Sequence, residues 1–337
     1  MNCALDKPQT LGKQNTAFNK AQKLNKGLVA KHFSAASNDY DRYAKVQKQI
    51  AEFNLELLHD SISCKAKQAV DLGCGTGLHT KSIADLSKNC LAIDISHGML
   101  AVARTHNSQT KTAQGNEIRY CTGDADNLPL HSNSIDLLHS SMALQWCSSP
   151  KKAIEEIVRV LSRQGSAQLA IMLDSSLFEL KNAWKSIELE PRVNEFFSKE
   201  EWLHAMHDLV TKLNSSDLNT QLSVKHQSGT FVEWHSSSLQ MLRALKRVGA
   251  ATKSELEGHA ERCNDPLAMD GVQEHKLPNL NSISKTELRL LDQEMQKQLE
   301  QNFANCVDAN QTKEKKLVGR LPLSYQVLFL TIQKNKA

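Results

Sequence analysis

Residues 69–77 read Ala69-Val70-Asp71-Leu72-Gly73-Cys74-Gly75-Thr76-Gly77, a short apolar run followed by an acid and three alternating glycines. The apolar run predicts a buried strand, and the glycines predict a turn directly after it. Glycine has no Cβ, so these positions tolerate positive φ and let the main chain approach a ligand closely. The stretch therefore predicts a strand that ends in a loop for a nucleotide-sized ligand.

The spacing of the glycines narrows the choice of ligand. The dinucleotide fingerprint places its third glycine where this chain has Leu78, or Thr80 if the count starts at Gly75. No Gly-Lys-Ser/Thr follows, which excludes a phosphate-binding P-loop. Asp71 would repel a pyrophosphate, and it suits a ligand that is cationic or donates hydrogen bonds. A sulfonium compound with an amino group fits this description.

Two further predicted strands also end in acids. Residues 90–94 end at Asp94, and residues 118–125 end at Asp124 and Ala125. In doubly wound folds a carboxylate near the position of Asp94 binds ribose hydroxyls, and Asp124 is placed to accept from an adenine amino group. Because the carboxyl ends of parallel strands meet at one edge of a sheet, the three acids are expected around one crevice.

Predicted helices and strands alternate along the first half of the chain. Apolar residues recur at helical spacing over 43–58, and this helix is expected to lie across the crevice as a lid. Helices near 78–86, 99–103 and 151–161 alternate with strands at 134–140 and 168–172. This alternation predicts an α/β fold with a doubly wound, mostly parallel sheet.

Composition places the chain among soluble globular proteins, with 40% hydrophobic and 23% charged residues in 337. No apolar stretch reaches the ~18 residues of a membrane span, and the N-terminus lacks the apolar segment of a signal peptide. The eight cysteines include no C-x-x-C pair, so we expect reduced thiols in a cytoplasmic protein. His204 and His207 lack a matching acid or thiol motif, so no metal site is predicted.

Positive charge is concentrated at the N-terminus. Residues 1–28 hold five lysines and one aspartate, so their net charge of 5 − 1 = +4 equals that of the whole chain. This polar segment is predicted to be a flexible lysine-rich extension. Basic residues interleaved with aromatics are absent, so no nucleic-acid partner is expected.

The three motifs together resemble those of the class I S-adenosylmethionine-dependent methyltransferases, which have a D-x-G-x-G-x-G loop, a second-strand acid and a third-strand Asp-Ala. The resemblance implies a Rossmann-like, seven-stranded sheet and S-adenosylmethionine as methyl donor. The cofactor-binding residues that it implies are Asp71, Gly73, Gly75, Gly77, Asp94, Ile95, Met99, Asp124 and Ala125.

A closer resemblance covers residues 29–335. The motifs at 33–40 with Gln47, 143–147, 245–250 and 319–325 are similar to those of the malonyl-acyl carrier protein O-methyltransferases of biotin synthesis. This implies one methyltransferase domain over 29–335, with a cofactor half at 29–174 and an acceptor half at 175–335. The lysine-rich extension and a polar insertion at about 252–318, just before the last strand, depart from the family pattern. Within the insertion, spaced apolar residues predict one amphipathic helix, Leu288, Leu291, Met295, Leu299 and Phe303.

The resemblance implies methyl transfer to the free carboxylate of malonyl on acyl carrier protein. A carboxylate is already ionised near neutral pH, so no catalytic base is expected. Tyr40, Gln145 and Trp146 are the candidates for the acceptor pocket. On a helix over 239–248, Arg243 or Lys246 is expected to neutralise the substrate carboxylate or to steer the carrier protein.

Two alternatives share the cofactor motifs. One is a methyltransferase of a small carboxylic acid or a quinone precursor, which would differ only in the acceptor half. The other is a methyltransferase-like assembly protein without transfer. The intact acids and glycines of the predicted cofactor site favour an enzyme over an assembly protein.

Overall fold

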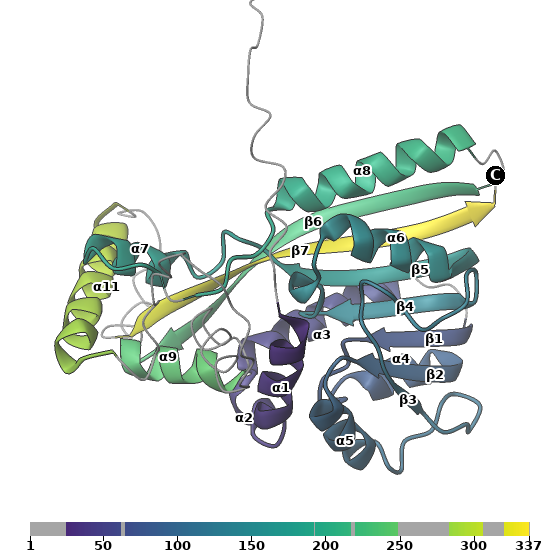
Figure 1. Ribbon diagram of the computed structural model, residues 1–337, viewed down its shortest axis with the longest axis horizontal. Coiled ribbons are helices and arrows are strands. Elements are labelled where there is room, and N and C mark those ends of the chain that lie inside the picture. Colours follow the sequence, from purple (N-terminus) through teal and green to yellow (C-terminus); the bar gives the residue numbers. More distant parts are fainter. Residues whose placement is uncertain are drawn as a thin grey trace, which may run out of the picture.

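The computed structural model describes residues 25–61, 65–191, 193–216, 220–248, 283–305 and 320–336. Within them, seven strands form one sheet in the order β3-β2-β1-β4-β5-β7-β6 (Figure 1). All neighbours from β3 to β5 pair in parallel, whereas β7 is antiparallel to both β5 and β6. The predicted doubly wound, mostly parallel α/β fold is therefore confirmed. The strands are β1 (Ala66–Leu72), β2 (Ser87–Asp94), β3 (Arg119–Thr122), β4 (Ile135–Ser141), β5 (Leu161–Met172), β6 (Thr220–His235) and β7 (Leu321–Lys336).

Helices surround the sheet, and the first of them begins at Lys26, before the predicted domain start at residue 29. The rest of the predicted extension, residues 1–24, lies outside the described residues. None of the described helices is both long and apolar enough to cross a membrane. The helices are α1 (Lys26–Ala36), α2 (Tyr40–Tyr43), α3 (Lys45–Ser61), α4 (Thr80–Asp85), α5 (His97–His106), the 3-10 helix η1 (Leu144–Trp146), α6 (Pro150–Val160), α7 (Phe178–Ser186), α8 (Lys199–Ser216), α9 (Ser238–Arg247) and α11 (Lys285–Asn305).

Strand β1 shows why the sheet is covered on both faces. Val70 and Leu72 belong to a core that includes Ile154 of α6 and Trp202 of α8. Ala69 belongs to a second core with residues of α3 and α4. Alternate side chains of a strand point to opposite faces, so a nearly continuous apolar strand needs a helical layer on each side.

Strands β6 and β7 form a long antiparallel arm that extends past the parallel strands, and α7, α9 and α11 gather around its far end (Figure 1). Leu291 of α11 is fully buried there in one core with Trp184 and Met241. The amphipathic helix predicted inside the insertion is thus present, and it belongs to a core that also includes Ile50 of α3 and Met172 of β5. The rest of the insertion, together with Gly249, Ala250 and Gly319 of the family motifs, lies outside the described residues.

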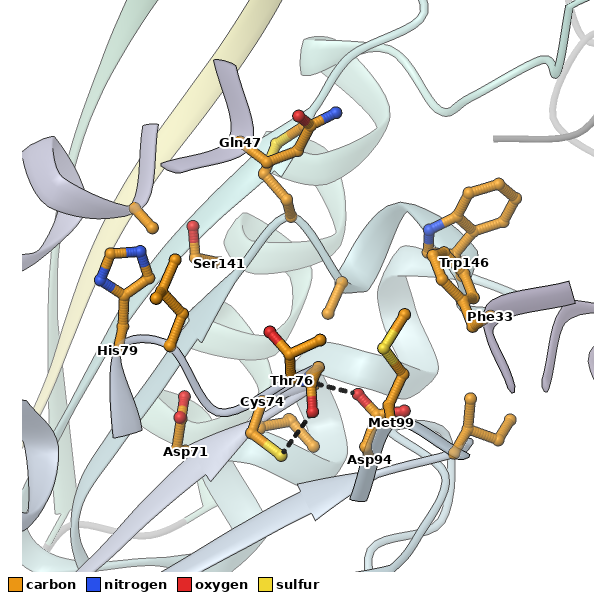
Figure 2. A pocket seen from close by; sticks show the side chains of 18 of the residues that line it. Phe33, Gln47, Asp71, Cys74, Thr76, His79, Asp94, Met99, Ser141 and Trp146 are labelled. Carbon is orange, nitrogen blue, oxygen red and sulfur yellow. Dashed lines mark hydrogen bonds between the residues drawn. The ribbon is translucent and has the colours of Figure 1, made fainter. Parts of the chain in front are cut away.

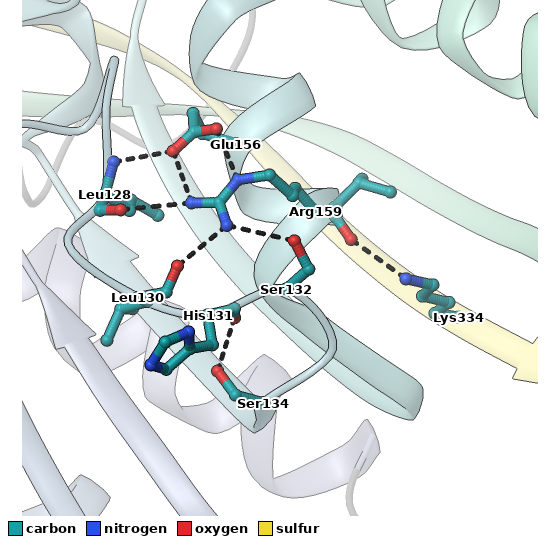
Figure 3. Close-up of polar contacts among 9 residues, drawn as sticks. Leu128, Leu130, His131, Ser132, Ser134, Glu156, Arg159 and Lys334 are labelled. Atoms are coloured by element: carbon teal, nitrogen blue, oxygen red, sulfur yellow. Dashed lines mark hydrogen bonds and ion pairs between the residues drawn. The ribbon is translucent and has the colours of Figure 1, made fainter.

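Helix α6 holds the loop that follows β3. Arg159 donates to the backbone oxygens of Leu128 at 3.1 Å and Leu130 at 2.8 Å, and it is ion-paired with Glu156 at 2.7 Å (Figure 3). Glu156 in turn accepts from the backbone nitrogen of Leu128 at 2.7 Å. The hydrogen bonds from Arg159 lower the pKa of Glu156, which stays ionised. This network fixes the loop just after the predicted adenine-binding residues.

Candidate functional site

The predicted turn follows β1, and its three glycines all have positive φ, +69° at Gly73, +55° at Gly75 and +74° at Gly77. The backbone nitrogen of Gly73 donates to the oxygen of Ile93 at 2.7 Å, which joins the loop to β2. A Cβ on Gly73 would lie 2.1 Å from the Cβ of Ala143. Position 73 requires glycine because its φ is positive and because the chain after β4 passes close to it.

Asp71 precedes this loop at the end of β1, and its side chain is 5% exposed. One carboxylate oxygen accepts from the hydroxyl of Thr80 at 2.6 Å, and the other lies 3.2 Å from Nδ1 of His139. The sequence predicted an anion that faces a ligand. Asp71 lines the cavity described below, and both of its oxygens already have protein partners, so it also orders the loop.

Asp94 ends β2 with both oxygens bound to backbone nitrogens, Gly75 at 2.9 Å and Ser96 at 2.8 Å. Burial raises the pKa of Asp94 to about 6, and the negative charge of Asp71 adds to this rise. Each carboxylate oxygen has two lone pairs. One lone pair on each oxygen therefore remains for a ligand hydroxyl, as a ribose diol would require.

Asp124, after β3, binds Lys26 of α1, with 2.5 Å between Nζ and Oδ1. Asp126 is ion-paired with the same lysine. Burial alone would lower the pKa of Lys26, but the hydrogen bonds that Lys26 donates to both carboxylates outweigh it and raise that pKa. The assignment of Lys26 to a flexible extension was therefore wrong, because this residue fastens α1 to the predicted adenine-binding loop.

Helices α1 and α2 form the lid over the strand ends, and α3, which was predicted to be the lid, contributes Gln47, Lys48 and Ala51 to the wall of the cavity described below. Besides Lys26, two contacts fasten the lid. The hydroxyls of Ser34 and Ser96 are 2.7 Å apart, and Asp41 accepts from the hydroxyl of Thr76 in the glycine loop at 2.6 Å. The lid is thus attached at each of the three loops that carry predicted cofactor-binding residues.

A cavity with an empty volume of about 1130 Å³, part of it open to solvent, lies between the lid and the strand ends. Gly77 is the predicted cofactor residue that does not line it, since it packs against Ala103 and Asn107 at the end of α5. The other eight line it, namely Asp71, Gly73, Gly75, Asp94, Ile95, Met99, Asp124 and Ala125.

Three polar atoms in the cavity wall have no hydrogen-bond partner within the described residues, Oε1 of Gln47, Nε2 of His79 and Oγ of Ser141. Figure 2 shows these side chains on one side of the cavity and Phe33 and Trp146 on the other. Burial lowers the pKa of His79, so its imidazole is neutral. Buried polar atoms are normally paired, so this wall fits a ligand with its own polar groups, such as the amino and carboxyl groups of S-adenosylmethionine. That cofactor, when bound, supplies an electrophilic methyl group.

A second cavity, with an empty volume of about 510 Å³, adjoins the first. Trp146 stands between them, edge to face with Phe33 at 5.6 Å and with Phe196 at 5.8 Å between ring centroids. The predicted acceptor residues Tyr40, Gln145 and Trp146 all line the second cavity. The residues that line both cavities are Phe33, Tyr40, Gln47, Met142 and Trp146.

Met142 is a site residue that the sequence did not reveal. It has φ = +54°, a left-handed conformation that is uncommon for a large side chain, and its oxygen accepts from Nε2 of Gln145 at 2.8 Å. Such strain is found most often at functional sites. Ser141 and His79 were also missed, whereas Phe33 and Gln47 belong to the entrance motif and were not assigned a role.

Arg243 and Lys246 lie on the exposed face of α9, while Leu245 and Val248 line the second cavity. Neither basic residue lines either cavity. Next to them, Arg247 lies over the ring of Tyr43 at 4.3 Å from its centroid and donates to its hydroxyl. The structure therefore places this basic face outside the site rather than against the reacting group.

Comparison with known proteins identifies the family of this chain. Residues 70–169 match the family described as a methyltransferase domain. The solved structure of the YcgJ protein from Bacillus subtilis is similar, with a TM-score of 0.49 and 16% identity over 85% of this chain and 100% of that one. Malonyl-[acyl-carrier protein] O-methyltransferase from Marinomonas sp. is 30% identical over 92% of this chain and 94% of its own length. The enzyme of that name from Serratia marcescens is 32% identical over 67% of this chain and 80% of its own length. The chain therefore belongs to the malonyl-[acyl-carrier protein] O-methyltransferase family and is an S-adenosylmethionine-dependent O-methyltransferase.

Proposed function

We propose that this chain transfers the methyl group of S-adenosylmethionine to the free carboxylate of malonyl carried by acyl carrier protein, in biotin synthesis. The observation that carries the proposal is the pair of adjoining cavities. The first has the cofactor motifs in its wall, and the second is largely apolar and meets it at Trp146. A methyl donor in one and a short acyl group in the other would be in contact at this junction.

The chemistry of the acceptor fits the lining of the second cavity. Its described lining residues include no lysine or arginine. A malonyl carboxylate is ionised near neutral pH without a base, and a carboxylate without a cationic partner keeps its nucleophilic electron pairs available. The chain's contribution is then to orient the carboxylate and to exclude water. Tyr40 suits this wall because burial, with a contribution from Asp94, raises the pKa of its phenol and keeps it neutral.

We assign the basic face of α9 to the carrier protein. Arg243, Lys246 and Arg247 are exposed beside residues that line the second cavity. A carrier with an acidic surface would be attracted to them, and such steering weakens as salt is added. Replacing Arg243 and Lys246 by alanine should raise KM for the carrier-bound substrate. KM for malonyl-coenzyme A should stay as it is.

A matched control removes two lysines from a distant helix. Lys151 and Lys152 are exposed on α6, so their alanine variants change net charge equally without touching α9. Equal kinetics in the two double variants would refute the assignment of α9.

Complementation tests the activity itself. A bacterial strain unable to start biotin synthesis should grow without biotin when it expresses this chain and fail to grow with the Asp71→Ala variant. Failure of the unaltered, soluble chain to support growth would count against the proposed function.

A further inference from the structure

A chain of polar side chains leads from the cofactor cavity across one face of the sheet, from β1 to β7. From Asp71 it passes through His139 of β4, Asn54 of α3 and Gln168 of β5 to Thr331 of β7. The successive distances are 3.2 Å, 3.1 Å, 3.0 Å and 2.7 Å. His139 is 1% exposed, and Asn54 and Gln168 are fully buried.

One backbone oxygen sets the direction of the hydrogen bonds around Asn54. The oxygen of Ser140 can only accept, and the side chain of Asn54 approaches it at 3.1 Å, so the atom that faces it is the amide nitrogen. The same nitrogen lies 3.1 Å from Nε2 of His139, and the amide oxygen accepts from Gln168. Nε2 of His139 is therefore an acceptor without a proton.

The tautomer of His139 follows from this arrangement. A neutral imidazole without a proton on Nε2 has its proton on Nδ1, which is the nitrogen that faces Asp71. A second proton would require Asn54 to turn over, and its bonds to Ser140 and Gln168 would be lost. His139 thus donates a hydrogen bond to Asp71 without adding a positive charge.

Asp71 consequently keeps its negative charge beside the cavity. Its other oxygen accepts from the neutral hydroxyl of Thr80. Among the described residues, no lysine or arginine forms an ion pair with Asp71. A negative charge in a partly closed site attracts the cationic groups of a ligand, which in S-adenosylmethionine are the ammonium and the sulfonium.

We propose that His139 is a positioning residue. Held by Asn54 in its neutral Nδ1–H form, it orients Asp71 and leaves that carboxylate charged, ready to bind a cationic group of S-adenosylmethionine. The inference rests only on the cofactor-binding part of the proposed function. Its tests need no acceptor, so failure of the carrier reaction would not affect them.

Proton–nitrogen correlation spectra of the isotopically labelled, full-length protein test the tautomer directly. His139, assigned by comparison with the His139→Asn variant, should show a single ring proton, on Nδ1, near neutral pH. A proton on Nε2, or on both nitrogens, would overturn the proposal.

Titration calorimetry with S-adenosylmethionine tests the positioning role. His139→Leu should weaken binding about tenfold, because Asp71 loses its oriented donor. His139→Asn presents an amide nitrogen near the position of Nδ1 and should recover most of the affinity. Ser87→Ala is the stability control, since Ser87 is fully buried and its hydroxyl bonds only backbone oxygens of Ile83 and Ala84. Unchanged affinity in His139→Leu, an equal loss in Ser87→Ala, or no recovery in His139→Asn would refute the positioning role.

Discussion

Gly98 provides a specific test of the lid, because it lies on α5 where Ser34 of α1 crosses. A Cβ at Gly98 would lie 2.7 Å from Cα, 2.8 Å from Cβ and 2.9 Å from the backbone oxygen of Ser34. Carbon atoms pack at about 3.5–4.0 Å, and two of the three contacts involve main chain, so in Gly98→Ala helix α1 must retreat as a unit. Overpacking of this kind costs about 1–3 kcal/mol, against at most about 1 kcal/mol gained in helix propensity.

We expect the loss to fall mainly on the cofactor. Helix α1 carries Val29 and Phe33 of the cavity wall, so Gly98→Ala should weaken S-adenosylmethionine binding about tenfold, equivalent to ~1.4 kcal/mol. Titration calorimetry gives this value, and thermal unfolding of the ligand-free protein gives the change in stability. Ala101→Gly at an exposed position of α5 is the control, and it should lower Tm without changing affinity. An unchanged affinity in Gly98→Ala would refute the argument that the lid position controls cofactor binding.

Four further predictions concern other parts of the site. Because burial raises the pKa of Asp94 to about 6, cofactor affinity should fall by up to tenfold for each pH unit below about 6. Asp94→Asn should remove this pH dependence. A Kd that does not change with pH in the unaltered protein would contradict the ribose role. The same raised pKa means that Asp94 contributes stability at low pH that is lost as pH rises through about 6, which thermal unfolding against pH would detect. Lys26→Met leaves the buried carboxylate of Asp126 without its cation, so the free energy of unfolding in urea titrations should fall by about 1–2 kcal/mol. An unchanged unfolding midpoint would mean that this ion pair does not stabilise the fold. Of the two cavities, Leu245 lines only the second, so Leu245→Trp should reduce turnover of the acyl acceptor while Kd for S-adenosylmethionine stays constant. Weaker cofactor binding in this variant would contradict the assignment of the two cavities to two ligands.

The cofactor half was predictable because its signals are local. An apolar strand that ends in an acid and glycines has few possible structures, and each acid at a strand end lies next to the backbone that positions it. Asp94 illustrates this, since it bonds Ser96 two residues later. Gly77 shows the limit of such local signals. The glycine pattern shows where the backbone has positive φ, but it does not show whether a cofactor or helix α5 occupies the adjacent space.

The acceptor half was less predictable because its elements depend on distant partners. Strand β6 is largely polar and exposed, and it is held by pairing with β7 about a hundred residues later, so its sequence shows no clear strand pattern. Lys26 looked like part of a charged tail because its partners, Asp124 and Asp126, are far along the chain. The same holds for His139, whose tautomer depends on a side chain of α3.

The central claim is that this chain methylates malonyl on acyl carrier protein. The most direct measurement is mass spectrometry of malonyl-acyl carrier protein after incubation with the purified chain and S-adenosylmethionine. The account predicts a methyl ester on the carrier-bound malonyl group, formed with the unaltered chain and absent with Asp71→Ala. An unmodified malonyl group, under conditions where calorimetry shows that the cofactor is bound, would contradict the claim.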